Sequence, residues 1–264
     1  MTELIRTGTR SRFDSIVIDS PANRNALSLR LLTEALNAVR DSARGAGRGL
    51  VIEHAGPAFC SGVDLKERRA LAREDQSHSR LLADLLRELW RYPKPVVVFV
   101  DGAVRGGGLG VLSCADLVVA TTASTFAYSE ARVGVAPALV MAVTLATASS
   151  RELMPHLLTG AAFDAATAES LGLVGRVVDT AERFDVDGVL GSFTHGAPAA
   201  QAVIKQLSRD WVTRDVSAVL HQMTVLSAEL FAGDEAREGM TAFAEHRPPH
   251  WHDDRPMPSE TNTP

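Results

Sequence analysis

The chain has 264 residues and a mass of 28.2 kDa, which is enough to bury a sizeable core in one large domain. Hydrophobic residues make up 45% and charged residues 22%, so the composition excludes a disordered or fibrous protein. The formal net charge of -5 argues against a general polyanion binder, and we expect no nucleic-acid partner.

The two cysteines, Cys60 and Cys114, are too few for a disulfide framework and lack the spacing of a zinc site. The N-terminal stretch has no apolar run long enough for a signal peptide. No segment reaches the roughly 20 apolar residues of a membrane span. We therefore expect a cytoplasmic protein without a membrane span or a bound metal.

Strands and helices alternate in the first part of the chain. We expect a β-hairpin that includes a strand from Phe13 to Asp19, and then a helix over LRLLTEALNAVRDSA with Ser28 as its N-cap. A short apolar strand from Gly49 to Glu53 leads into the loop HAGPAFCSGVD. A helix from Ser79 to Arg91 precedes the run PVVVFVDG, which is typical of a buried strand.

The second half of the chain changes from mixed to helical. The runs LVVA and STFAYS predict strands, VAPALVMAVTLATA and SRELMPHLLTG predict helices, and ESLGLVGRVVD predicts a helix end that turns into a strand. After about Asp185 we expect three helices, from Ala197 to Arg209, Val216 to Phe231 and Asp234 to His246. The chain thus divides into a core over 1–185, a helical region over 186–247 and a polar Pro-rich tail over 248–264.

Two loops combine small residues with a following helix. They are GPAFCSGVD, residues 56–64, and RGGGLG, residues 105–110. The first turn of a helix has unpaired N–H groups and a positive dipole end, and glycine lets a ligand oxygen approach closely. Each loop alone could be no more than a tight turn. Together they suggest a site that stabilises negative charge on an oxygen.

Five stretches resemble, in chain order, successive stretches of the crotonase (enoyl-CoA hydratase/isomerase) family. They are GPAFCSGVDLKE, KPVVVFVDGAVRGGGLGVLSCADLVVA, FAYSEARVGVAP, LLTGAAFDAATAESLGLVGRVVD and DEAREGMTAFAEHRPPHW. The resemblance implies an α/β fold, a spiral of ββα units with a helical C-terminal trimerisation region at 186–247. It also implies a homotrimer or a hexamer built from two trimers.

The resemblance also implies a site for an acyl-CoA substrate, with CoA as part of the substrate and no separate cofactor. The backbone N–H groups of Val63 and Gly107 would form an oxyanion hole for the thioester oxygen. CoA would be contacted by Arg24, Asp64, Leu65 and Lys66, although Arg24 and Lys66 could equally be exposed surface charges. Phe243 and His246 match positions that can touch a neighbouring subunit's CoA, but a core phenylalanine and a solvated histidine explain them as well.

The resemblance implies that Glu130 is the acid/base group. Hydratases of the family commonly have two glutamates, and this chain has Gly110 at the first position and Glu130, in FAYSE, at the second. Partial burial would raise the pKa of Glu130 toward a useful range, whereas an ion pair with Arg132 would make it structural. We expect structural roles for Asp101 and Asp116, and a buried unreactive thiol for Cys60.

Four functions fit these residues. The first is an enoyl-CoA hydratase that adds water to a 2-enoyl-CoA, with Glu130 as the one retained acid/base. The second is a 3-enoyl-CoA to 2-enoyl-CoA isomerase, which needs only one base. The third is a crotonase relative that binds acyl-CoA without turnover, and the fourth is another chemistry, such as decarboxylation or thioester hydrolysis, that uses the same oxyanion hole.

Overall fold

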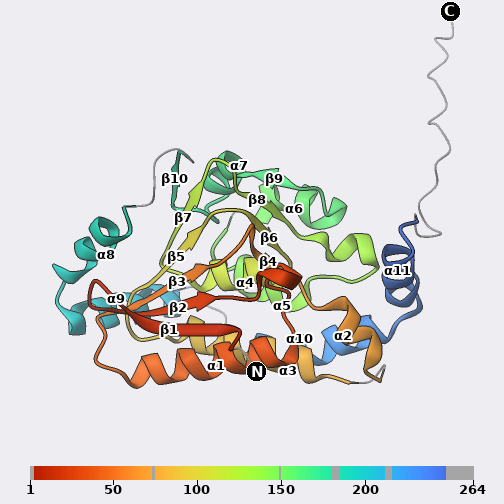
Figure 1. Ribbon diagram of the computed structural model, residues 1–264, viewed down its shortest axis with the longest axis horizontal. Coiled ribbons are helices and arrows are strands. Elements are labelled where there is room, and N and C mark those ends of the chain that lie inside the picture. The colour runs from red at the N-terminus through yellow and green to blue at the C-terminus, as the bar shows by residue number, and fades with distance from the viewer. Residues whose placement is uncertain (1–2, 73–74, 149, 180–184, 212–215, 248–264) are drawn as a thin grey trace, which may run out of the picture.

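The computed structural model describes residues 3–72, 75–148, 150–179, 185–211 and 216–247. Its strands form two sheets with helices around them (Figure 1). The chain opens with a hairpin in which β1 (Ile5–Arg10) and β2 (Phe13–Ile18) pair antiparallel. Ser11 and Arg12 have φ angles of 46° and 70°, which suit the tight turn between these strands. The expected hairpin is therefore confirmed.

The larger sheet has six strands in the order β1-β2-β3-β5-β7-β10. From β2 onward all neighbours are parallel. Every residue of β5 is buried, which explains why its sequence VVVFV is continuously apolar. The strands added to the hairpin are β3 (Leu50–His54), β5 (Val96–Val100), β7 (Leu117–Thr121) and β10 (Arg176–Val178).

The smaller sheet has the order β4-β6-β8-β9. Its strands are β4 (Ala58–Ser61), β6 (Ala103–Arg105), β8 (Thr125–Ala127) and β9 (Phe163–Asp164). The sequence analysis predicted a loop through all of HAGPAFCSGVD, and this prediction is wrong where β4 lies. Strands of three or four residues are too short for an alternating pattern to show in the sequence.

The first three strands of the smaller sheet bring distant parts of the chain together. They are parallel, and Ser61 pairs with Arg105, which pairs with Ala127. Each strand follows a strand of the larger sheet and leads into a helical segment: β4 into α2 (Leu65–Ala70), β6 into α4 (Gly107–Cys114), and β8 into the 3₁₀ helix η2 (Ser129–Val133). Because carboxyl ends of parallel strands meet at one edge, these three connections lie close together.

One face of the larger sheet is covered by α1 (Leu29–Arg44) and its neighbour α3 (Ser77–Trp90). The Ser28 side chain accepts a hydrogen bond from the backbone N–H of Leu31, so the expected N-cap is confirmed. Against α3 pack α5 (Ala138–Thr144) and α10 (Val216–Ala232). These helices enclose the main hydrophobic core.

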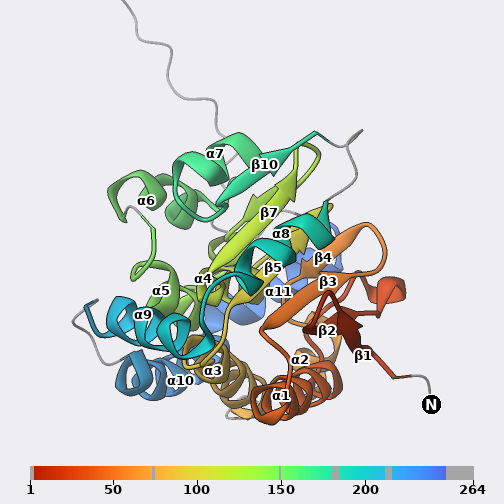
Figure 2. The same cartoon turned by 90° about the vertical axis from the view of Figure 1, so that its left-hand side faces the viewer.

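The opposite face of the larger sheet is covered by α8 (Val186–Thr194), whose Val186 and Leu190 join a second apolar cluster with Phe13 and Val97 (Figure 2). The sequence analysis missed this helix. Gly188 and Gly191 lower its intrinsic helix propensity, so its order depends on packing against the sheet. The three helices that were expected are present as α9 (Pro198–Trp211), α10 and α11 (Asp234–Ala244).

The remaining helical elements are η1 (Pro21–Asn23), α6 (Ser150–Thr159) and α7 (Ala165–Ser170). In the described ranges, no helix combines the length and hydropathy needed to cross a bilayer. The boundary proposed at 185 stays a prediction, and the tail at 248–264 lies outside the described residues.

Candidate active site

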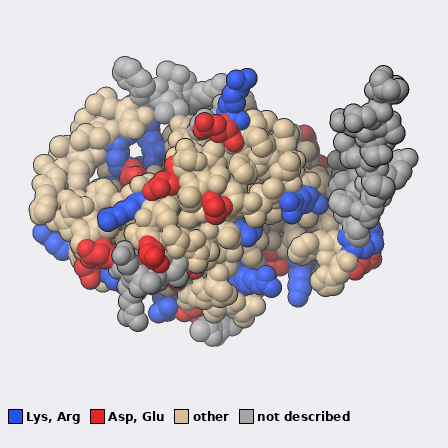
Figure 3. Space-filling model, turned by 90° about the horizontal axis from the view of Figure 1, so that it is seen from above, with Lys and Arg blue, Asp and Glu red and all other residues tan. Residues whose placement is uncertain are grey.

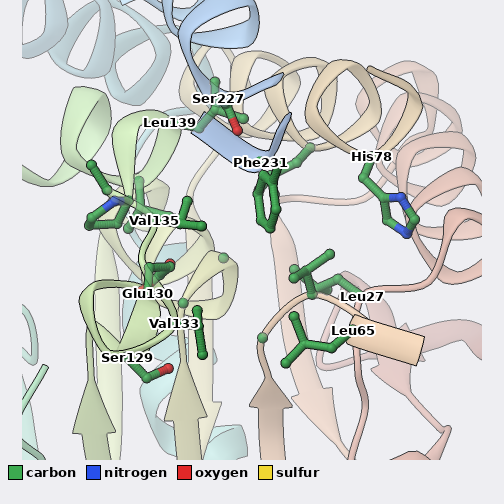
Figure 4. A pocket seen from close by; sticks show the side chains of 18 of the residues that line it. Leu27, Leu65, His78, Ser129, Glu130, Val133, Val135, Leu139, Ser227 and Phe231 are labelled. Carbon is green, nitrogen blue, oxygen red and sulfur yellow. The ribbon is translucent and has the colours of Figure 1, made fainter. Parts of the chain in front are cut away.

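A pocket of about 450 Å³ opens where the ends of the smaller sheet meet the helices (Figure 4). Its walls are mainly apolar and come from segments as distant in the chain as Leu27 and Phe231. Of the sequence-predicted residues, it brings together Val63, Leu65, Gly107, Glu130 and Phe243. A concave, largely apolar pocket with a few polar groups is the usual form of a small-molecule site.

Val63 presents its backbone N–H because of how its segment pairs. Leu27 donates to the carbonyl of Gly62 at 2.8 Å and accepts from the N–H of Asp64 at 3.3 Å, so the bridge between Leu27 and Val63 is parallel. In a parallel bridge of this kind the central residue directs its own N–H to the other side. Within the described residues the Val63 N–H has no acceptor.

Gly107 is the first residue of α4, where a helix has N–H groups without intrahelical partners. The preceding Gly106 has φ 52° and ψ -122°, a conformation that L side chains rarely adopt. A Cβ on Gly106 would lie 2.9 Å from Oε1 of Glu130, and one on Gly107 would lie 2.5 Å from Cδ1 of Leu27. The backbone therefore requires glycine at 106, whereas a side chain at 107 would have to displace the end of the Leu27 side chain. The described part of the chain offers no acceptor to the Gly107 N–H.

Glu130 lies in η2 with its carboxyl group against the Gly106 turn. The residue as a whole is half-buried, but its Oε2 is fully buried and has no hydrogen-bond partner among the described residues. Burial raises the pKa of Glu130 to about 7 because the charged form loses hydration. Arg132 donates from Nε to the carbonyl of Thr159, so the structure does not support an ion pair between Arg132 and Glu130.

Gly110, at the position of the absent first glutamate, is closely surrounded by apolar side chains. A Cβ there would lie 3.1 and 3.2 Å from the two Cδ atoms of Leu86 and 3.6 Å from Cγ2 of Val140. A carboxylate on a longer side chain would have to displace them. Among the described residues that line the pocket, Glu130 is the one carboxylate.

The residues expected to contact CoA separate into two groups. Leu65 lines the pocket, whereas Arg24, Asp64 and Lys66 do not. Asp64 is the N-cap of α2, and its Oδ1 accepts from the N–H groups of Lys66 and Glu67 at 3.1 Å each. Arg24 and Lys66 are exposed. Contacts of these residues with CoA therefore stay a prediction.

Phe243 on α11 lines the pocket of its own chain although its surface is 63% exposed. His246 follows the end of the helix and does not line the pocket. Whether either residue touches the CoA of a second subunit stays a prediction.

Asp101, Asp116 and Cys60 were considered as other candidates for a chemical role, and their contacts indicate structural roles instead. Asp116 accepts from the backbone N–H of Val96 at 2.8 Å and pairs with Lys205. Asp101 accepts from the Thr121 hydroxyl at 2.8 Å directly after β5. Burial raises the pKa of Cys60 to about 12, which excludes a reactive thiolate at neutral pH.

The sequence analysis did not single out several polar side chains in the pocket. They are His78 and Ser79 on α3, Ser227 on α10, and the cation Arg247. His78 lies 2.9 Å from Glu67 through its Nε2, and burial lowers the pKa of His78. A single polar residue in a helix commonly faces solvent. The sequence therefore gave no indication that these side chains meet in one pocket.

The geometry of the pocket is suited to stabilising an oxyanion next to a group that exchanges a proton. Two backbone N–H groups can hold an oxygen as it gains negative charge, and the carboxyl group beside them can exchange a proton near neutral pH.

Comparisons with known proteins agree with this capability. The family model described as enoyl-CoA hydratase/isomerase matches residues 11–255. The enoyl-CoA hydratase EchA19 of Mycobacterium tuberculosis is 30% identical over 246 residues, which cover 89% of this chain and 91% of that protein. A crystal structure of an enoyl-CoA hydratase from Mycobacterium avium is 35% identical with a TM-score of 0.82, covering 95% and 100% of the two chains. The methylmalonyl-CoA decarboxylase of Escherichia coli is 27% identical over 239 residues, covering 86% and 89%.

Proposed function

Because this chain belongs to the enoyl-CoA hydratase/isomerase family, we propose that it is an enoyl-CoA hydratase that adds water to a 2-enoyl-CoA. Its fold is the α/β crotonase fold, with two mixed sheets and C-terminal helices. It is an enzyme of this family. The observation that carries the proposal is the buried Glu130 carboxyl beside the free N–H groups of Val63 and Gly107.

In the proposed reaction the thioester oxygen accepts hydrogen bonds from the N–H groups of Val63 and Gly107. The oxygen of water forms a bond to the β-carbon, and the electron pair of the double bond moves toward the thioester oxygen to give an enolate. Protonated Glu130 then gives its proton to the α-carbon, and the proton lost by the water returns to the carboxylate. Loss of one oxyanion donor typically costs about 10²–10³ in rate, so the two N–H groups supply a large share of the catalysis.

A second candidate is the 3-enoyl-CoA to 2-enoyl-CoA isomerase, and a specific observation favours it. Leu86 and Val140 occupy the surroundings of Gly110, where a hydratase with two glutamates would hold its water. Moving a double bond needs one base, which takes a proton from the α-carbon and returns it to the γ-carbon. Ionised Glu130 could carry that proton without a second carboxylate.

The proposal also covers the substrate class and the oligomeric state. We expect acyl-CoA as the substrate, with Leu65 along the pantetheine arm and Lys66 and Arg24 near phosphates. We also expect a cytoplasmic homotrimer or hexamer.

The test is to incubate the purified protein in heavy water with a 2-enoyl-CoA and with a 3-enoyl-CoA and to follow the products by NMR. Formation of a 3-hydroxyacyl-CoA identifies a hydratase, and double-bond movement without hydration identifies an isomerase. Loss of carbon dioxide from a 2-carboxyacyl-CoA would instead indicate chemistry like that named for the Escherichia coli relative.

Glu130→Gln should lower turnover by about 10²–10⁴-fold, because the amide cannot exchange the proton. Glu229→Gln is the matched control, since Glu229 is an exposed acid on α10 outside the pocket, and it should keep the wild-type rate. Unchanged turnover in Glu130→Gln would rule out the acid/base role.

A further inference from the structure

Two serine hydroxyl groups, from Ser79 and Ser227, form a polar site among apolar residues of the pocket. Ser79 on α3 and Ser227 on α10 both line it, and their Oγ atoms are 3.0 Å apart. Both residues are buried, with 7% and 6% of their surfaces exposed. Figure 4 places Ser227 beside Leu139 at the upper end of the pocket, away from Glu130 and beyond Val135.

The hydrogens of this pair are not all used. Two hydroxyls carry two hydrogens, and the bond between them uses one. Within the described residues neither hydroxyl has another partner. Thr224, on the same helix as Ser227, instead donates to the carbonyl of Leu220 at 2.9 Å. A buried donor without an acceptor is unfavourable, so the free O–H suits an oxygen on a bound molecule.

Among the described residues, the two helices that carry the serines, α3 and α10, contribute no Asp, Glu, Lys or Arg side chain to the pocket lining. His78, which precedes Ser79 on α3, also lines the pocket, and burial lowers the pKa of His78, which favours the neutral ring. Glu67 accepts from the N–H of Leu29 at 2.8 Å, so its carboxylate is an acceptor, and the contact with His78 assigns the ring hydrogen to Nε2. Of the described cations that line the pocket, Arg132 comes from η2, and Arg247 comes from the residues that follow α11.

We propose that Ser79 and Ser227 form a specificity site for acyl-CoA whose acyl group carries an uncharged oxygen, a hydroxyl or keto group, remote from the thioester. This inference rests on the proposed function, because it requires the acyl group to enter this pocket. The substrate oxygen accepts the unused O–H of the serine pair. A purely alkyl chain leaves that donor unsatisfied and binds more weakly for the same length.

The test is calorimetric and does not depend on turnover. The dissociation constants of saturated acyl-CoA esters with four, six and eight carbons are compared with those of the same esters carrying a terminal hydroxyl group. We expect the wild type to bind the hydroxylated ester about tenfold more tightly for at least one length. The double variant Ser79→Ala with Ser227→Ala should remove this preference mainly by weakening the hydroxylated ester.

Ser113→Ala is the matched control, because Ser113 is a buried serine outside the pocket that donates to Leu109 and bonds to Thr144. It should leave the preference unchanged. Equal binding of both esters at every length, or a preference that survives the double variant, would overturn the specificity site and leave the pair as a link between α3 and α10. Binding with the expected preference but without turnover would support the site and refute the hydratase. Binding of no acyl-CoA would overturn both.

Discussion

The burial of the Glu130 carboxyl group sets its protonation equilibrium. Its Oε2 has no hydrogen-bond partner among the described residues. Loss of hydration is the largest cause, and it raises the pKa to about 7 by disfavouring the carboxylate. The group therefore exists in both protonation states near neutral pH, as an acid/base catalyst requires.

The raised pKa predicts opposite pH profiles for the two candidate reactions. Hydration uses protonated Glu130, so kcat/KM for a 2-enoyl-CoA should be level in acid and fall as pH rises through about 7. Isomerisation uses the carboxylate, so kcat/KM for a 3-enoyl-CoA should rise through the same pH and then level off. Initial rates between about pH 5 and 9, corrected for thioester hydrolysis without enzyme, measure both. A profile that shows no change near pH 7 for the active substrate would contradict the assignment of Glu130.

At the scale of elements, three short strands position the proposed catalytic groups. The paired carboxyl ends of β4, β6 and β8 lie at one edge of the smaller sheet and are followed by Val63, Gly107 and Glu130. The backbone thus fixes two of the three groups directly. Substitutions of the Val63 side chain leave its N–H in place, whereas a side chain at Gly107 meets Leu27.

Asp64 gives a test of what holds α2 next to Val63. Asp64→Ala removes the cap of α2 and should lower the free energy of unfolding by about 1 kcal/mol, whereas Asp64→Asn keeps an oxygen that can accept and should cost less. Urea unfolding measures both variants. If the charge of Asp64 instead contacts CoA, Asp64→Asn and Asp64→Ala will weaken acyl-CoA binding equally in calorimetry.

Local patterns in the sequence predicted the long elements. The periodic leucines of α1 and the Ser28 cap were sufficient for that helix, and VVVFV for β5. The strand β4 and the helix α8 were missed, since β4 is too short for a pattern and α8 contains two glycines. Family motifs led to Glu130 and Gly107, but Ser79 and Ser227 are 148 positions apart and meet only through helix packing.

At the scale of the whole molecule, the C-terminal helices take part in the pocket. Ser227 and Phe231 from α10 and Gly239 from α11 line it together with residues of the α/β core. Seen from above, cations and anions are interspersed on the surface (Figure 3), and that face shows no continuous basic patch for a polyanion. This agrees with a small-molecule substrate held in a pocket between the core and its helices.

The same helical region carries apolar side chains that a single chain does not cover. On α9, Val203, Ile204 and Leu207 are 53%, 64% and 62% exposed. They lie at helical spacing, so they form one stripe. Contiguous exposed apolar surface commonly marks an interface, and the trimer that the sequence predicted would give this stripe a partner.

The oligomer prediction can be tested on this stripe. Light scattering coupled to size exclusion should give three or six times 28.2 kDa for the wild type. Ile204→Glu with Leu207→Glu should shift the mass to that of one chain, because burying each side chain contributes about 1.5–3 kcal/mol and a buried unpaired carboxylate opposes association. Leu158→Glu is the control, since Leu158 is 71% exposed on α6, apart from the stripe, and should keep the wild-type mass. A wild type that elutes as a single chain would contradict the trimer, and an unchanged mass in the double variant would place the interface elsewhere.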